Sequence, residues 1–337
     1  MRRDGRRRAA GTIGAVLVLL AGLAACGGDD DSDGDDPGGA EDAAGSTTSG
    51  DGDGGGDSAA VSAQELCDGA VGAEDVVTVA TEDLTEASGI ALSRQNEGVV
   101  WAHNDSGGAP EAYAVGLDGT DRGRLGLDGA EAFDWEDMAL GTGPGGADHL
   151  YLGDIGDNNA VRDEVVVYRL AEPAVPAEGL AAGATAPAER LTFTYADGPR
   201  DAETLLSDPS TGDLFVVSKT WDAGTVGIYR IPADATPDAP VVMERMGEVP
   251  ALAGEMVTGG DVSADGSLVA LRTYFGVQVW DRGAGQTVAD ALAGEPCEAP
   301  APFEVQGEAL AFTPDGRGYV TIAEGQSPRV NRFHLSD

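Results

Sequence analysis

Basic residues are scarce in this 337-residue chain. Twenty Lys and Arg face 59 Asp and Glu, which gives a formal net charge of −39 at pH 7, and Lys219 is the only lysine. Nucleic-acid binding requires a positive face for contacts to phosphate, so this imbalance argues against nucleic-acid partners. Divalent cations and cationic or neutral ligands are compatible with such a charge.

Cysteine is also scarce, and the common catalytic motifs are absent. The three cysteines show no spacing typical of a zinc site. The chain lacks a Gly-x-Ser-x-Gly elbow, a P-loop and a dinucleotide fingerprint, so the familiar serine-hydrolase and nucleotide sites are not indicated. In an oxidising compartment Cys67 and Cys297 are candidates for a disulfide, with two separate buried thiols as the alternative.

The longest apolar run, from Ala9 to Ala25, is short for a membrane span. It follows a basic stretch, which is the pattern of a signal peptide. The run ends in Leu-Ala-Ala-Cys at 23–26, which looks like a bacterial lipobox. We therefore expect residues 1–25 to be a lipoprotein signal peptide and Cys26 to carry the lipid. The mature chain would then be anchored to the cell membrane on its extracytoplasmic face. A plain secretory signal is the alternative.

The segment after Cys26 carries 11 acidic and no basic side chains over residues 27–60, with Gly, Ser and Ala making up most of the rest. Such a composition cannot bury enough apolar surface to fold. We interpret residues 26–60 as a lipidated cysteine followed by a disordered tether. Residues 61–337 then form the folded domain, which we expect to be monomeric.

A short sequence motif recurs five times in that domain, at a period of about 50 residues. Each copy is followed by a tight turn and a β-rich run, which is typical of the blades of an all-β propeller. The interpretation is five blades, or six if the irregular stretch 172–188 hides another unit. The copies begin at Ser88, Glu136, Glu203, Thr258 and Glu308.

The last repeat has no fourth strand before the chain ends. Residues 75–80 read as a strand and precede the first repeat, so we expect them to complete the last blade and close the ring. The fourth strand of the fourth blade is predicted at residues 287–292.

In a propeller the innermost strands start, and the second strands end, at one mouth of the central channel. Carboxylate and amide oxygens gathered there suit Ca²⁺ or Mg²⁺. The alternatives are a lining that hydrogen-bonds water and direct catalysis without a metal. The predicted metal ligands are Glu136, Glu203, Glu308, Asp154, Asp157 and Asn158.

Three residues at the ends of second strands are candidates for catalysis. His103, which precedes Asn104 and Asp105, is a candidate general base, although a histidine at a strand end more often satisfies loop carbonyls. Lys219 and Arg272 would hold an anionic group or balance the glutamates.

Several motifs resemble those of secreted actinobacterial β-propeller lipoproteins of poorly defined function. More distantly, residues 88–91 and 307–310 look like blade motifs of esterase-like phytase propellers and of calcium-dependent lactonase propellers. That resemblance implies a cation at the channel mouth and hydrolysis of an ester or phosphoester. The first resemblance rests on His-Asn-Asp-Ser-Gly (103–107), Gly-Asp-Ile-Gly-Asp-Asn (153–158), Asp-Gly-Pro-Arg-Asp-Ala-Glu (197–203), Ala-Leu-Arg-Thr-Tyr (270–274) and Gln-Gly-Glu-Ala-Leu-Ala-Phe-Thr-Pro-Asp-Gly (306–316).

Together these patterns favour a membrane-anchored propeller that binds a divalent cation and a small polar or phosphorylated ligand without turnover. A metal-dependent phosphoester, ester or lactone hydrolase is the first alternative. A glycosidase with carboxylates in the channel and a scaffold that docks cell-envelope proteins are further alternatives.

Overall fold

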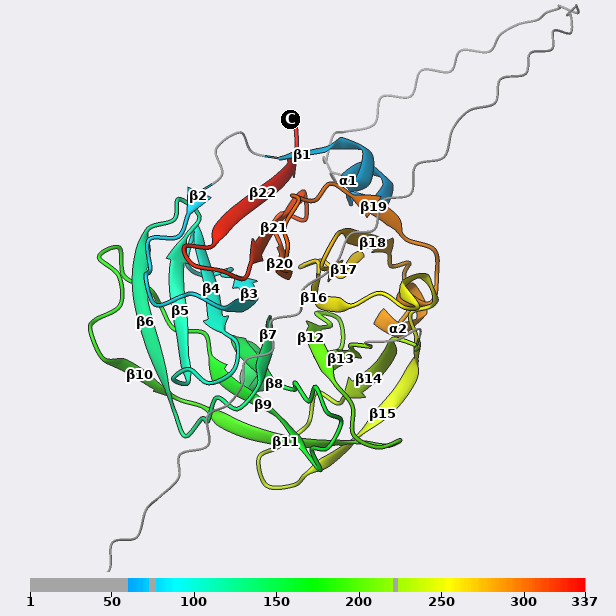
Figure 1. Cartoon of the computed structure of the whole chain (residues 1–337), viewed down its shortest axis with the longest axis horizontal. Coiled ribbons are helices and arrows are strands. Elements are labelled where there is room, and N and C mark those ends of the chain that lie inside the picture. The colour runs from blue at the N-terminus through cyan, green and yellow to red at the C-terminus, as the bar shows by residue number, and fades with distance from the viewer. Residues whose placement is uncertain (1–59, 73–76, 221–223, 337) are drawn as a thin grey trace, which may run out of the picture. The chain divides into compact units, whose positions relative to one another are not determined.

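The computed structural model describes residues 60–72, 77–220 and 224–336. Most of its regular structure is β-strand, arranged as a ring of sheets around a central axis (Figure 1). This arrangement confirms the predicted β-propeller. The strands nearest the centre of the ring are β3 (Ala87–Leu92), β7 (Trp135–Thr142), β12 (Ala202–Ser207), β16 (Val257–Val262) and β20 (Gly307–Phe312).

From β3 outward, the first group of antiparallel strands is β4 (Val99–Asn104), β5 (Glu111–Gly116) and β6 (Asp121–Asp128). An additional strand, β10 (Ala184–Pro187), pairs parallel to β6 at the outer edge. The prediction that residues 172–188 are irregular is therefore wrong for the last part of this stretch, where β10 forms. Ala184 and Ala186 alternate towards the core of this group, and that packing holds the backbone extended.

The next two groups join into one eight-stranded sheet. The join is made by the outermost strand of each group, because β11 (Glu189–Tyr195) pairs in parallel with β15 (Val241–Glu248). A 3-10 turn, η1 (Pro144–Gly146), connects β7 to β8, and another, η2 (Pro250–Leu252), precedes β16. After β7 come β8 (Asp148–Asp154), β9 (Val165–Ala171) and β11 (Glu189–Tyr195). After β12 come β13 (Leu214–Ser218), β14 (Gly227–Ile231) and β15 (Val241–Glu248).

The fourth group continues from β16 into β17 (Leu268–Thr273), β18 (Val277–Asp281) and β19 (Cys297–Ala299). The strand predicted at residues 287–292 is wrong, because the helix α2 (Val288–Leu292) stands there. Thr287 and Asp290 form a capping box that starts the helix, and four of its five side chains are buried.

The last group contains β20, β21 (Gly318–Ala323) and β22 (Arg329–Leu335). Two strands from the other end of the chain, β1 (Ala70–Gly72) and β2 (Val77–Thr78), pair antiparallel with β22. The expected closure of the ring by an N-terminal strand is therefore confirmed, with β1 as a second contributor. Both strands cover the outer edge of β22.

The predicted disulfide is also confirmed. Cys67 lies in the helix α1 (Ala63–Gly69) and is bridged to Cys297 in β19, with their Cα atoms 6.1 Å apart. The bridge fastens the N-terminal segment to the fourth group of strands.

The apolar core lies between neighbouring groups of strands, in five clusters of buried side chains. Trp101 packs in the cluster between the first two groups and Trp280 in the one between the third and fourth. Trp135 is also core, at 1% exposure. We interpret the five groups as the expected five blades.

None of the helices among the described residues is long and apolar enough to cross a membrane. The expected signal peptide, the lipidated Cys26 and the tether up to residue 59 lie outside the described residues.

Candidate functional site

An irregularity recurs at the start of every innermost strand. The pairing with the next strand shifts register across Glu136 in β7, Glu203 in β12 and Glu308 in β20. The same shift occurs at Ser88 in β3 and at Thr258 in β16. Such a β-bulge leaves a residue out of the ladder and changes the direction of its side chain. All five repeat-initial residues therefore lie at bulges.

A cavity of about 190 Å³ lies where the innermost strands begin. It contains Glu136, Glu203 and Glu308, together with Asn158, so these four predicted ligands share one site. Six carboxylates and a single ammonium group line it. The lining residues are Glu86, Ala87, Ser88, Asp105, Glu136, Asn158, Glu203, Lys219, Tyr274, Gln306, Glu308 and Glu324.

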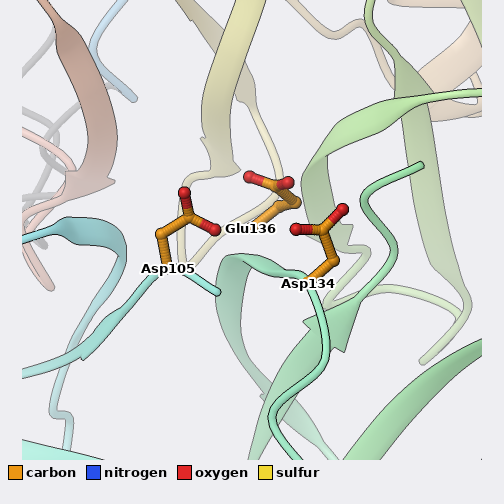
Figure 2. Close-up of side chains that lie close together, drawn as sticks. All are labelled: Asp105, Asp134 and Glu136. Atoms are coloured by element: carbon orange, nitrogen blue, oxygen red, sulfur yellow. The ribbon is translucent and has the colours of Figure 1, made fainter. Parts of the chain in front are cut away.

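Three of these lining carboxylates belong to two overlapping clusters, which two neighbouring aspartates outside the lining complete. In each cluster one oxygen from each of three residues lies within 4.8 Å of the other two. The first contains Asp105, Asp134 and Glu136, whose carboxylates face one another in Figure 2. The second contains Glu136, Asp201 and Glu203. Glu136 is common to both clusters, whereas Glu308 lines the cavity but belongs to neither. Clusters of three carboxylate oxygens are compatible with a hard cation.

Lys219 occupies one part of the cavity wall. Its ammonium donates hydrogen bonds to Glu203 Oε1 and, at 3.0 Å, to the hydroxyl of Tyr274. The same ammonium lies 5.0 Å from the centre of the Tyr274 ring. Burial opposes the charge on Lys219, but the neighbouring carboxylate of Glu203 keeps the pKa of Lys219 above its ordinary value.

Glu136 and Glu308 differ from Glu203 in having no such partner. No described residue donates a hydrogen bond to either carboxylate, although their exposures are only 4% and 7%. Burial and the charge of Glu203 hold the pKa of Glu136 well above its ordinary value. Two buried carboxylates thus face the cavity, and the only compensating charge among the described lining residues is Lys219, which is already paired with Glu203.

Three further carboxyls in or beside the cavity have pKa values perturbed in the same direction. Burial raises the pKa of Glu203 to about 8, against the opposing effect of Lys219, and burial with Glu203 raises the pKa of Glu308 to about 9. Burial and the charges of Asp105 and Asp201 raise the pKa of Asp134 to about 6. Bringing so many acids together therefore favours either bound protons or a bound cation.

Two predicted ligands, Asp154 and Asp157, do not line the cavity. Asp154 forms an ion pair of 2.8 Å with Arg162 and accepts hydrogen bonds from backbone amides at residues 133 and 134. Asp157 accepts the backbone N–H of Arg162 at 2.7 Å. Their oxygens hold the loop after β8 in shape, so their assignment as metal ligands is not supported by their positions.

The candidate base His103 also lies away from the cavity. It is fully buried, packs edge-on against Trp135, and its Nδ1 lies 2.9 Å from the Asn104 carbonyl oxygen. Burial lowers its pKa to about 4, so the imidazole stays neutral. Arg272 is 2% exposed, forms an ion pair with Glu304, and does not reach the cavity either.

Sequence reasoning did not assign Asp105 as a ligand, and it also missed Asp134 and Asp201, although a signal for these two was present. Each stands two residues before a bulge glutamate, as Asp-Trp-Glu at 134–136 and Asp-Ala-Glu at 201–203. The same offset in two repeats places each aspartate beside its glutamate.

No family model and no curated protein matches the chain. Solved structures resemble it in fold at low identity. The β-propeller domain of Cps50 (Swd1) from Myceliophteria thermophila is 12% identical, with a TM-score of 0.41 over 78% of this chain and 100% of that one. Kuenenia stuttgartiensis hydrazine synthase is 10% identical, with a TM-score of 0.39 over 74% of this chain and 64% of that one.

A chain of the mitotic checkpoint complex is 16% identical, with a TM-score of 0.37 over 74% of this chain and 61% of that one. The chain thus spans less than two thirds of the length of the hydrazine synthase chain and of the checkpoint chain. These likenesses concern the fold alone, and no function follows from them.

Proposed function

We propose that this protein is a lipid-anchored propeller on the extracytoplasmic face of the cell membrane. Its axial cavity would bind a divalent cation, Ca²⁺ or Mg²⁺, together with a small polar or phosphorylated ligand. The observation that carries the cation is Glu136. Its buried carboxylate belongs to both acidic clusters and receives no hydrogen bond from the described residues. An ionised carboxylate in that position costs free energy unless a cation offsets its charge.

The donor set fits a hard cation. The lining offers carboxylate oxygens and the amide oxygen of Asn158, while no cysteine or histidine is among the described lining residues. Oxygen-only sets suit Ca²⁺, Mg²⁺ or Mn²⁺, whereas softer metals prefer sulfur and imidazole.

The chemical class of the small ligand follows from the one positive group among the described residues that line the same cavity. Lys219 and Tyr274 present an ammonium and a phenol that meet at 3.0 Å. A carboxylate or phosphate group of a small ligand would meet the bound cation on one side and this pair on the other. A bound divalent cation is often the largest local charge in a site, so it can attract an anionic group into acidic surroundings.

A metal-dependent hydrolase is the second candidate, and one observation favours it. The pKa of Glu308, raised to about 9, lets this side chain hold a proton near neutral pH, whereas Glu203 is paired with Lys219. A group of this kind can donate a proton to a leaving group. When bound, a divalent cation supplies polarisation of an ester or phosphoester oxygen. His103 and Arg272 are buried outside the cavity, so these roles fall to the glutamates and Lys219.

Calorimetric titration of Ca²⁺ and of Mg²⁺ into the chelator-treated full chain tests the cation. We expect Glu136→Gln to weaken binding by at least about tenfold, a loss seen even for residues that only support metal ligands. Glu298→Gln is the matched control, because Glu298 is exposed on β19 and lies outside the cavity. Equal binding by both variants, or no binding of either ion by the native chain, would refute the proposal.

A further inference from the structure

Large exposed apolar side chains are concentrated on one face of the propeller. Five of the seven in the described chain lie on loops at the end of the propeller where the innermost strands begin. All three exposed phenylalanines are among them, at exposures of 66%, 73% and 94%. We call this set the apolar rim; it consists of Phe133, Val161, Phe275, Phe303 and Val305.

The positions of these residues follow from the order of the strands. Phe133 precedes β7, and Phe303 and Val305 precede β20, on loops that lead from an outermost strand to an innermost one. Val161 follows β8 and Phe275 follows β17, on loops that lead from a second strand to a third. In an antiparallel blade both kinds of loop emerge on the face where the innermost strands begin. The rim residues therefore lie on the same face as the mouth of the cavity, on loops of the second, fourth and fifth groups of strands.

The sequence neighbours of three rim residues agree with this placement. Phe133 is followed by Asp134 of the first acidic cluster, and Phe275 is preceded by Tyr274 of the cavity wall. Val305 adjoins Gln306, which also lines the cavity. Scattered single apolar residues on a surface are ordinary, but a group around a polar centre is typical of an interaction site.

The charge of the cavity next to the apolar rim further restricts the chemistry of a binding partner. Six carboxylates and one ammonium line the cavity. A divalent cation would therefore still leave about three negative charges if every group were ionised. A partner surface that fits must be apolar where it meets the rim and positive where it meets the cavity.

We propose that the apolar rim and the cavity together form a docking face for a protein partner that presents a lysine or arginine among apolar side chains. The basic side chain would enter the mouth, and its apolar neighbours would cover the phenylalanines. This arrangement matches the usual anatomy of an interface, in which one desolvated anchor is enclosed by contacts that exclude water. The inference does not depend on a bound cation. An anionic membrane surface is disfavoured as the occupant, because its headgroups would face the carboxylates.

Selection from a display library of random peptides against the full chain tests this inference. We expect the enriched peptides to carry lysine or arginine next to leucine, isoleucine or phenylalanine. A synthetic peptide of that consensus should bind the Phe275→Ser, Phe303→Ser double variant at least about tenfold more weakly than the native chain. Changing its basic residue to glutamate should abolish binding.

A matched pair of valine substitutions provides the control. Val305→Ser changes the rim, whereas Val242→Ser changes another exposed valine, on the outer strand β15; their exposures are 80% and 63% respectively. Only Val305→Ser should weaken the peptide. An enriched set without basic residues, equal weakening by both variants, or binding of phosphatidylglycerol vesicles that is lost in the rim variant would overturn the inference.

Repeating the peptide measurement with chelator, and the cation titration on the Phe275→Ser, Phe303→Ser double variant, separates the two proposals. If only the cation proposal fails, the native chain binds the peptide but neither ion. If only the rim proposal fails, both the native chain and the rim variant still bind the cation in calorimetry.

Discussion

The carboxyl of Glu308 makes the cation-free protein less stable as the pH rises, and replacing it with glutamine should remove this effect. Glu308 is 7% exposed at the bulge of β20, and no described residue donates a hydrogen bond to its carboxylate. Glutamine keeps nearly the same shape and cannot ionise. The change Glu308→Gln therefore tests the electrostatics of the cavity with little change in packing.

The size of the effect follows from the shift in pKa. Burial and the charge of Glu203 raise the pKa of Glu308 from 4.5 to about 9. Between these values the folded chain holds a proton that the unfolded chain has released, so the free energy of unfolding falls as the pH rises. At pH 7 the loss is at most about 3 kcal/mol, because each pH unit above 4.5 contributes about 1.4 kcal/mol. The full stability is present at and below about pH 4.5.

Urea unfolding in the presence of chelator, from about pH 4.5 to about pH 9, measures this dependence. We expect native protein and Glu308→Gln to be equally stable at the acid end. The variant should become the more stable of the two as the pH rises. Glu298→Gln, on the surface of β19, should follow the native curve throughout.

A saturating divalent cation should narrow this difference at neutral pH, because its positive charge favours the ionised form of Glu308. A ligand at a hundredfold excess over its Kd stabilises the folded state by about 2.7 kcal/mol, and the variant would lose part of that gain. The reasoning is refuted if Glu308→Gln is destabilised by the same amount at every pH with and without chelator. Glu308 would then act through a hydrogen bond rather than through its charge.

Two further changes test the anchor and the ion pair. Cys26→Ser should release the protein from the membrane into the medium, which fractionation and immunoblotting would detect; retention at the membrane would contradict lipidation of Cys26. Lys219→Met should cost about 3–5 kcal/mol in urea unfolding, because it leaves Glu203 buried without its partner. Adding Glu203→Gln should restore most of that loss, and a double variant as unstable as Lys219→Met would contradict the assignment.

The repeat predicted the fold and the glutamates because both depend on local sequence. Each copy begins at the residue that the structure places at a bulge, so Glu136, Glu203 and Glu308 could be aligned without coordinates. The bulges themselves could not be foreseen, since a register shift depends on the neighbouring strand. The helix α2 was missed, although Thr287 and Asp290 form the capping box that marks its start.

Candidates at the ends of second strands were harder to place. His103 and Arg272 stand at equivalent ends of β4 and β17, yet both side chains are buried outside the cavity. The side chains of successive residues in a strand point to opposite faces of the sheet. Which side chain faces the channel therefore depends on the exact residue at which the strand ends. Lys219, one residue past the end of β13, does reach the cavity.

The five bulge positions divide into two chemical roles. Ser88 and Thr258 donate hydrogen bonds to backbone carbonyls of the next innermost strand, at Glu136 and Gly307, over 2.6 Å and 2.7 Å. Each of these hydroxyls therefore holds the backbone at or beside a bulge that carries a glutamate. The repeat thus supplies five equivalent sites, of which two position neighbouring strands and three turn a carboxylate towards the axis.

This division explains why the acidic clusters are asymmetric in a fold built from similar units. Asp134 and Asp201 stand two residues before the bulges of β7 and β12, and Asp105 follows β4, so the clustered carboxylates come from the first three groups of strands rather than from the whole channel. Glu308 faces the same cavity from β20, where Gln306 takes the position of the aspartates. A cation held between β7 and β12 would leave Glu308 free to contact a second ligand. The stability of Glu308→Gln should then respond to that ligand more strongly than to the metal alone.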